Sequence, residues 1–188
     1  QGAAYSITFR LADSLPKEIV DAYKAEREEL EEKAHATEGE LTEKESKRLE
    51  HLYSDRIGAY LDAGHGKCWL QKKEIADLVK GALEHFDGDR YQLAAWCIMP
   101  NHVHVIVQPL GEHQLSDILH SWKSFTAHEV KKLIEIDGAF WQNESYDHLI
   151  RDLEEFDNQI AYVVNNPAQA GLDDWEWVWR RDAPTTSQ

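Results

Sequence analysis

The sequence predicts a single α+β domain in which helices pack on an antiparallel sheet. Two apolar runs, residues 91–99 and 102–108, are separated only by Pro100-Asn101, and so tight a connection joins neighbouring antiparallel strands. Two further segments, residues 72–86 and 114–136, carry apolar residues at helical spacing. Short strands and amphipathic helices in this order are typical of an α+β domain.

The N-terminal part begins with a strand and continues into a charged segment. Residues 5–11 alternate and are rich in aromatic and β-branched residues, which predicts the first strand. We expect Ser14 to cap a helix that has Pro16 near its first turn. Residues 17–56 hold thirteen acidic and eight basic side chains and few large apolar ones. They are therefore expected to form a charged helical insertion outside the core, broken near residues 37–39.

The later elements follow from periodicity and from turn residues. Asp87-Gly88-Asp89 ends the helix predicted over 72–86, and residues 141–150 predict a short strand and turn. Residues 153–166 predict the last helix, which we expect Pro167 to end because proline breaks the helical hydrogen-bond pattern. Residues 173–188 form a tail rich in Trp and Arg. The 188 residues are thus expected to form one domain with an insertion and a tail.

The charge restricts the function classes that fit. Thirty-five acidic residues against twenty Lys and Arg give a net charge of −15, which repels a polyanion such as DNA. Any nucleic-acid function therefore needs a local basic surface or a metal ion. No run of about eighteen apolar residues is present, so no membrane span is expected. Cys68 and Cys97 do not form a Cys-x-x-Cys pair, and a reducing cytoplasm is the expected location.

The most informative motif is the pair His102 and His104. On a strand these two imidazoles share one face, while the alternate valines share the other. Neutral imidazole is the commonest metal ligand, and a strand holds two of them at a fixed spacing. The pair therefore indicates half of a metal site. The alternative is an ordinary half-buried strand that happens to carry two histidines.

Three interpretations of this pair compete. A histidine-triad nucleotide hydrolase needs a third histidine where this chain has Ile106, which excludes that chemistry. A zinc hydrolase needs a third protein ligand, and no His-Glu-x-x-His motif supplies one. The third interpretation is a metal-polarised phosphate attacked by a separate nucleophile. Tyr162 and Asn166 are four residues apart, so they project from one helical face and can supply the nucleophile and an oxygen ligand.

The same residues belong to a wider set of motifs. The chain resembles the REP-associated tyrosine transposases, relatives of the single-tyrosine HUH transposases of insertion sequences, from Tyr5 to about Trp177. The matching segments are Phe9-Arg10-Leu11-Ala12-Asp13-Ser14-Leu15-Pro16, Met99-Pro100-Asn101-His102-Val103-His104, Trp122-Lys123-Ser124-Phe125-Thr126-Ala127, Trp141-Gln142, Ile150-Arg151, Tyr162 through Pro167, and Ala170-Gly171-Leu172. This resemblance implies a ferredoxin-like core, recognition of DNA hairpins, and a nuclease that cleaves and rejoins single strands.

The resemblance also implies roles for individual residues. His102 and His104 correspond to the metal-binding pair, Asn166 to the position that helps to hold the metal, and Tyr162 to the nucleophile. Mg²⁺ or Mn²⁺ is the implied cofactor, although imidazole is softer than the ligands that Mg²⁺ prefers. Attack by Tyr162 leaves a 5′-phosphotyrosine and a free 3′ hydroxyl. Tyr146 is the rival nucleophile, and His120, His128 and His148 are possible extra ligands.

The expected partner is a single-stranded DNA hairpin of the REP type, bound by a monomer or a homodimer. Arg10, Lys123 and Arg151 lie in the matching motifs and are the candidate phosphate contacts. Arg180 and Arg181 follow interleaved tryptophans, a pattern suited to stacking on unpaired bases. Those tryptophans can equally pack on the core. Two other functions stay open: a non-catalytic hairpin-binding protein that retains the fold, and a metal phosphohydrolase for small nucleotides.

Overall fold

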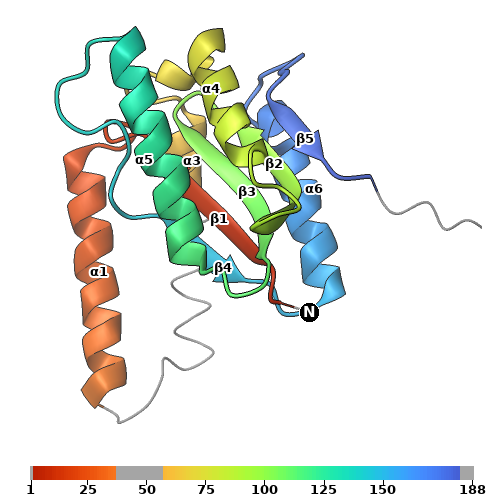
Figure 1. Ribbon diagram of the computed structural model, residues 1–188. Coiled ribbons are helices and arrows are strands. Elements are labelled where there is room, and N and C mark those ends of the chain that lie inside the picture. The colour runs from red at the N-terminus through yellow and green to blue at the C-terminus, as the bar shows by residue number, and fades with distance from the viewer. Residues whose placement is uncertain (1, 37–56, 183–188) are drawn as a thin grey trace, which may run out of the picture. The chain divides into compact units, whose positions relative to one another are not determined.

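The computed structural model describes residues 2–36 and 57–182 (Figure 1). The chain divides into two compact units. One contains residues 1–12 and 68–188, and the other contains residues 13–67. Among the described helices, none combines the length and the apolar character that crossing a bilayer requires.

The larger unit is built on a five-stranded sheet in which every neighbouring pair is antiparallel. The spatial order is β4-β1-β3-β2-β5. The strands are β1 Tyr5–Arg10, β2 Tyr91–Ile98, β3 His102–Pro109, β4 Tyr146–Leu149 and β5 Val178–Arg180. The predicted α+β class with helices on an antiparallel sheet is confirmed. The first four strands, with a helix between β1 and β2 and another between β3 and β4, follow the ferredoxin-like β-α-β-β-α-β order.

Helices cover both faces of this sheet. On one face, α4 (Lys73–Glu84) and α5 (Leu115–Leu133) bury the main core together with Val103, Val105 and Val107 of β3. A short 3-10 helix, η2 (Trp69–Gln71), precedes α4. On the other face, α6 (Leu153–Gln169) packs on a smaller cluster that includes Ile106 and Val163. Figure 1 shows α4 and α5 in front of the sheet and α6 behind it. The histidine pair therefore faces α6.

A bulge in β2 adjusts which residues reach each core. The pairing of β2 with β3 shifts register between Leu93 and Ala95. The extra residue lets Leu93 and Trp96 both enter the main core, while Ala95 joins the α6 cluster. Without this shift, strict alternation would place Leu93 and Trp96 on opposite faces.

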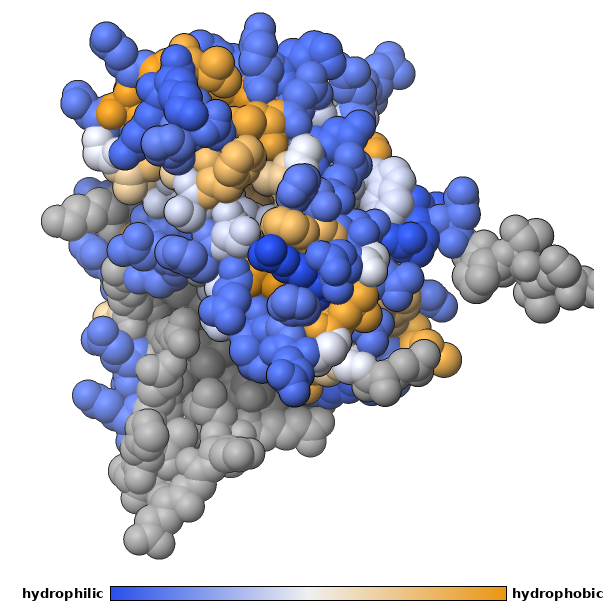
Figure 2. All heavy atoms as spheres, viewed as in Figure 1, coloured by the Kyte–Doolittle hydropathy of each residue, from blue (hydrophilic) through white to orange (hydrophobic). Residues whose placement is uncertain are grey.

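Hydrogen bonds from buried tryptophans tie α5 to its surroundings. Trp122 Nε1 donates to the Tyr91 hydroxyl at 2.9 Å, and Trp141 Nε1 donates to Thr126 Oγ1 at 2.8 Å. Two of the motif segments, around residues 122–127 and 141–142, are thus joined through Thr126. They hold the loop before β4 against α5. The face viewed in Figure 2 is mostly hydrophilic, with apolar side chains gathered in patches over α4 and α5.

The smaller unit contains α1 (Lys17–Ala36) and α3 (Gly58–Asp62). Its apolar cluster is made by Leu15, Ile57 and Leu61. Gly66 has a φ of +88°, and a Cβ there would lie 2.5 Å from the carbonyl oxygen of Asp13. Only glycine fits this close approach, and the Lys67 N–H then donates to the Asp13 carboxylate at 2.9 Å. The predicted break near residues 37–39 lies outside the described residues.

The structure corrects the predicted end of the last helix. Pro167 does not end α6, which continues to Gln169. The proline lies in the last turn, where it removes one N–H, but the following N–H of Ala170 still donates to Asn166 O at 3.0 Å. Gly171, with a φ of +72°, follows the helix end. Part of the predicted tail is also ordered into β5, which pairs with β2.

Candidate active site

The histidine pair lies at the centre of the sheet on its α6 face. His102 and His104 are 1% and 6% exposed, and their Nε2 atoms are 2.9 Å apart. Alternation along β3 puts both rings on one face, and the valines between and after them anchor the strand in the main core. The two imidazoles are therefore held by the sheet and not by a flexible loop.

The outer ring nitrogens of both histidines are hydrogen-bonded. His102 Nδ1 is 2.7 Å from Asn101 Oδ1, and His104 Nδ1 is 2.8 Å from Thr8 Oγ1. An amide oxygen only accepts, so His102 donates from Nδ1 and its Nε2 carries a lone pair. Thr8 lies opposite His104 in the β1–β3 pairing. Outer partners of this kind orient the rings of metal-binding histidines.

Burial keeps both imidazoles uncharged. Burial lowers the pKa of His102 well below its ordinary value, and the neighbouring His104 lowers it further. Burial also lowers the pKa of His104, to about 4. Both rings are therefore neutral at physiological pH, which is the form that binds metal.

The spacing of the pair fits a shared divalent cation. Two nitrogens that each lie about 2.1 Å from an octahedral ion, at right angles, are about 3 Å apart. The observed Nε2 separation is 2.9 Å. Among the described residues, no three His, Cys, Asp or Glu side chains are grouped to hold a metal. Within residues 2–36 and 57–182, a metal site on this pair would therefore draw on another kind of ligand.

Helix α6 offers such a ligand and a phenol. The Tyr162 ring makes an edge contact with His104, with centroids 5.4 Å apart and planes inclined by 77°, and Tyr162 is 38% exposed. Asn166 lies one turn further along α6 and is completely buried. Neither polar atom of its amide has a hydrogen-bond partner in the described part of the chain. A buried amide without hydrogen-bond partners lowers the stability of the folded protein. Asn166 therefore suits the role of an oxygen ligand to a metal ion.

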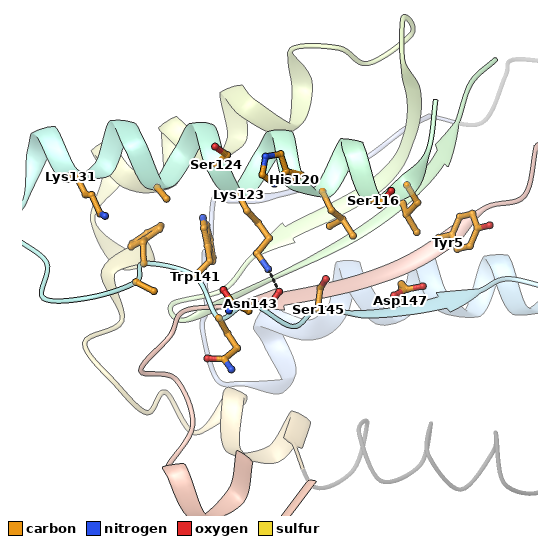
Figure 3. Close-up of a pocket in the computed structure, with 16 residues that line it drawn as sticks. Tyr5, Ser116, His120, Lys123, Ser124, Lys131, Trp141, Asn143, Ser145 and Asp147 are labelled. Carbon is orange, nitrogen blue, oxygen red and sulfur yellow. Dashed lines mark hydrogen bonds between the residues drawn. The ribbon is translucent and has the colours of Figure 1, made fainter. Parts of the chain in front are cut away.

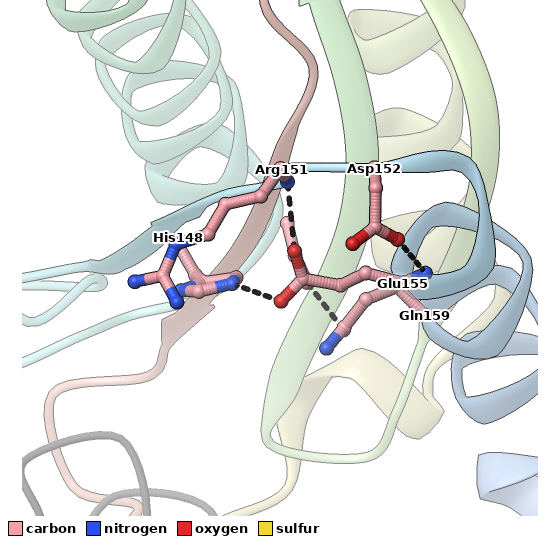
Figure 4. Close-up of polar contacts among 6 residues, drawn as sticks. His148, Arg151, Asp152, Glu155 and Gln159 are labelled. Atoms are coloured by element: carbon pink, nitrogen blue, oxygen red, sulfur yellow. Dashed lines mark hydrogen bonds and ion pairs between the residues drawn. The ribbon is translucent and has the colours of Figure 1, made fainter. Parts of the chain in front are cut away.

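The first turn of α6 is fastened to the sheet by Glu155 (Figure 4). Its carboxylate accepts from the Arg151 N–H and from His148 Nε2, each at 2.7 Å. The Asp152 side chain caps the helix by accepting from the Glu155 N–H at 2.8 Å. Further along, Ser6 Oγ donates to Gln159 Oε1 at 3.0 Å. These contacts set the position of α6, and with it that of Tyr162.

The rival residues lie in different surroundings. Tyr146 lies in the edge strand β4 and pairs with Thr8 of β1, which in turn pairs with His104 of β3. The backbones of Tyr146 and His104 are therefore two strand spacings, about 10 Å, apart. His148 is bonded to Glu155. His120 and His128 are carried by α5, on the opposite face of the sheet. Tyr162 is therefore the phenol in ring contact with the histidine pair.

The five candidate DNA-binding cations do not gather in one place. Arg10 lies opposite His102 and is 6% exposed, and its charge contributes to lowering the pKa of Lys123 after the larger effect of burial. Arg151 is exposed between β4 and α6. Arg180 and Arg181 lie at the far edge of the sheet, in and just after β5. Their role in DNA binding stays a prediction.

The C-terminal tryptophans pack on the core. Trp175 Nε1 donates to Ile98 O at 2.7 Å, Trp177 is 8% exposed, and Trp179 stacks on Trp96 with centroids 6.4 Å apart. Arg181 donates to Leu93 O at 2.8 Å and pairs with Asp87. Of the two interpretations of this segment, the structure agrees with the one in which the tryptophans pack on the core.

Sequence reasoning missed three residues that shape the site. Thr8 and Asn101 bond the histidines, and Glu155 anchors α6. Asn101 directly precedes His102 in the motif, which was a usable signal. Thr8 carried no local signal, because its partner His104 is 96 residues away. The partners of Glu155 are near in the sequence, at Arg151 and His148, but no motif marked the contact.

Comparisons with known proteins identify a family model and two relatives that match this chain. Residues 68–166 match the family model described as "Transposase IS200 like". A protein of Haemophilus influenzae described as a REP-associated tyrosine transposase is 25% identical over 118 residues, covering 55% of this chain and 65% of the relative. A REP-associated tyrosine transposase of Escherichia coli K12 is 25% identical over 115 residues, covering 56% and 65%. This chain thus spans slightly less than two thirds of the length of either relative.

A solved structure supports the fold. The structure of a REP-associated tyrosine transposase bound to a REP hairpin superposes with a TM-score of 0.54 at 16% identity, covering 95% of this chain and 76% of that chain. The family match includes β3 with both histidines and α6 as far as Asn166, and it spans more than half of the 188 residues. The chain belongs to the IS200-like transposase family.

Proposed function

We propose that this protein is a metal-dependent endonuclease and strand transferase for single-stranded DNA. It acts at hairpin-forming repeats of the REP type, through a covalent 5′-phosphotyrosine at Tyr162. The observation that carries the proposal is the ring contact between Tyr162 and His104, next to two neutral imidazoles whose Nε2 atoms are 2.9 Å apart. The two relatives described as REP-associated tyrosine transposases support the same activity.

His102, His104 and the Asn166 amide oxygen are the proposed ligands of Mg²⁺ or Mn²⁺. When bound, the cation polarises a DNA phosphate and neutralises charge that builds up during its displacement. Asn101 and Thr8 orient the imidazoles, and the anchored α6 presents Tyr162 beside them. The preorganised positions reduce the entropy cost of bringing phenol and phosphate together.

The proposed chemistry is a reversible transesterification. The Tyr162 oxygen bonds to phosphorus as the bond from phosphorus to the 3′ oxygen breaks. The phenol loses one proton, and the departing 3′ oxygen gains one. One phosphodiester is exchanged for another, so the released 3′ hydroxyl can attack the phosphotyrosine and rejoin strands without an external energy source.

The test is covalent adduct formation. The protein is incubated with Mn²⁺ and a DNA hairpin that has single-stranded extensions, and adducts are separated on a denaturing gel. We expect an adduct with the wild type and with Tyr146→Phe, and none with Tyr162→Phe or His102→Ala. An adduct that persists in Tyr162→Phe contradicts the assignment of the nucleophile. Hairpin binding without any adduct in Mg²⁺ or Mn²⁺ identifies instead a binding protein that retained the fold.

Further expectations concern the setting of this activity. The partner is a DNA hairpin of the REP type, and the protein acts as a monomer or a homodimer. We expect it to work in the cytoplasm, where its two cysteines stay reduced.

A further inference from the structure

Four side chains form a stripe along one side of α6. Glu155, Gln159, Tyr162 and Asn166 follow each other at intervals of three or four residues, which places them on one helical face. We call these four residues the polar stripe. The residue after each of the first three packs on the smaller core cluster: Phe156, Ile160 and Val163. The polar stripe therefore runs along one flank of the buried face of α6.

The polar stripe contacts three neighbouring strands in their spatial order. Its first three members each touch a different strand: Glu155 accepts from His148 Nε2 of β4 at 2.7 Å (Figure 4), Gln159 Oε1 accepts from Ser6 Oγ of β1 at 3.0 Å, and the Tyr162 ring contacts the His104 ring of β3. These strands are adjacent in the sheet, in the order β4-β1-β3. Helix α6 therefore crosses the sheet diagonally.

The alternation of the strands decides which side chains α6 can reach. Ser6 and His148 lie opposite each other in the pairing of β1 with β4, so both side chains point to the α6 face. Their neighbours Tyr5 and Asp147 point to the other face, where they line a groove beside α5 (Figure 3). The next residue of the same row, Ile106 of β3, is apolar and packs in the smaller cluster. Ser6 and His148 are thus the polar members of this row.

The spacing of the contacts on α6 matches their spacing on the sheet. From Glu155 to Tyr162 the helix rises about 10.5 Å along its axis. From His148 to His104 the path crosses two strand spacings and then two residues of β3, which amounts to about 12 Å. Both ends of this stretch of α6 are therefore in contact with the sheet only when the helix lies at one position along its own axis.

The polar contacts matter most in the first half of α6. The buried residues of this helix are Val163, Asn166 and Pro167, all in its second half. In the first half, Phe156 and Ile160 reach the core cluster but are only partly buried. Hydrogen bonds to β4 and β1 therefore carry a larger share of the attachment there than they do near Asn166.

We propose that Gln159, through its hydrogen bond with Ser6, is a positioning residue for Tyr162. The contact of Glu155 with His148 is the second fixed point. The inference rests on the proposed function, in which Tyr162 is the nucleophile. Together the two contacts hold α6 at the axial position that places the phenol beside His104. The imidazoles belong to β3 itself, so loss of the Ser6–Gln159 bond slows cleavage and leaves metal and hairpin affinity unchanged.

The first test measures the rate of adduct formation. Single-turnover rates are recorded with saturating protein and Mn²⁺, and hairpin affinity is measured separately in EDTA. Ser6→Ala and Gln159→Ala should each slow the reaction by about tenfold, because small displacements of a reacting group are costly. The double variant should be no slower than either single one, since all three lack the same contact. Hairpin affinity and Mn²⁺ affinity should stay within a few-fold of the wild type.

Two variants serve as controls for this experiment. Ser6→Thr keeps the hydroxyl donor and should react at close to the wild-type rate. Asn158→Ala removes the neighbouring amide, which is exposed on α6, and should also leave the rate unchanged. Wild-type rates in both Ser6→Ala and Gln159→Ala overturn the proposal. Rate losses that add up in the double variant also overturn it, because two residues acting through one bond cannot give them.

The second test does not need cleavage. The Tyr162 ring shifts the NMR signals of the His104 ring protons in the metal-free full chain, and Tyr162→Ala gives their positions without that ring. In Ser6→Ala and Gln159→Ala we expect these signals to move toward the Tyr162→Ala positions, and in Asn158→Ala to stay. Adduct formation with unchanged rates and unchanged His104 signals in both variants rejects only the positioning role. Shifted signals in a protein that forms no adduct reject only the cleavage activity.

Discussion

The Nε2 atoms of His102 and His104 face each other at 2.9 Å, and only one proton fits between them. Because His102 donates from Nδ1 to Asn101, the proton between the rings belongs to His104 Nε2, and Thr8 then donates its hydroxyl hydrogen to His104 Nδ1. Binding a cation on both Nε2 atoms requires His104 to carry its proton on Nδ1 instead. Thr8 must then accept the hydrogen bond that it otherwise donates.

The first prediction follows from this exchange at Thr8. Thr8→Val keeps the shape of the side chain but cannot accept from His104, so we expect Mn²⁺ affinity to fall about 10- to 100-fold. Thr8→Ser keeps the hydroxyl and should stay within a few-fold of the wild type. Isothermal titration calorimetry with Mn²⁺ measures both. Equal affinity in Thr8→Val and wild type would show that the hydroxyl does not take part.

We expect the Asn166 amide to destabilise the metal-free protein and to contribute to metal binding. Its buried amide has no hydrogen-bond partner in the described residues. Asn166→Leu, which has a similar size, should raise the unfolding free energy of the metal-free protein by about 1–3 kcal/mol. It should also abolish the stabilisation that Mn²⁺ gives the wild type. Denaturant unfolding with and without Mn²⁺ measures both effects.

The neighbouring Asn165 provides the control for that experiment. Asn165 is exposed on α6, so Asn165→Leu should change the unfolding free energy by no more than about 0.5 kcal/mol. It should keep the response to Mn²⁺. Destabilisation of metal-free Asn166→Leu would mean that the amide makes a favourable contact in the folded protein.

The stability of the metal-free protein should depend on pH through His104. Burial lowers its pKa from 6.5 to about 4, so between these values the unfolded chain binds a proton that the folded protein does not. The contribution is complete above pH 6.5 and is lost as the pH falls to 4, by up to about 3 kcal/mol. Urea unfolding in EDTA across this range measures it. His104→Gln should make the slope shallower without abolishing it, because the pKa of the remaining His102 is also lowered well below its ordinary value. An unchanged slope in that variant would exclude His104 as a source.

Glu155 should stabilise the first turn of α6. Glu155→Gln weakens the acceptor of the Arg151 N–H and of His148, and we expect a loss of about 1–3 kcal/mol in unfolding free energy. Burial raises the pKa of Glu155, but the bonds from Arg151 and His148 together lower it more. The stabilisation by the Glu155 carboxylate is therefore complete above the ordinary pKa of a glutamate and is lost as the pH falls through its lowered pKa. Glu154→Gln changes the exposed neighbour and should leave the stability unchanged.

Local periodicity was enough to predict most of the elements and half of the site. The alternation of β3 puts His102 and His104 on one face, and helical spacing puts Tyr162 and Asn166 on one side of α6, because both patterns depend only on backbone geometry. The same reasoning failed at Pro167. Whether a proline ends a helix depends on the hydrogen bonds available in its last turn, and Ala170 and Leu172 supply them here.

The amino-acid order alone therefore determined the strand pairing around Pro100-Asn101, the facing of the histidines and the spacing of the phenol and the amide. Only the folded chain decided that α6 covers the histidine face, which brings the Tyr162 ring to within 5.4 Å of the His104 ring. It also decided that the C-terminal tryptophans pack on the core. Contacts between distant segments depend on which surfaces are buried together. The local spacing of apolar residues does not specify those pairs of surfaces.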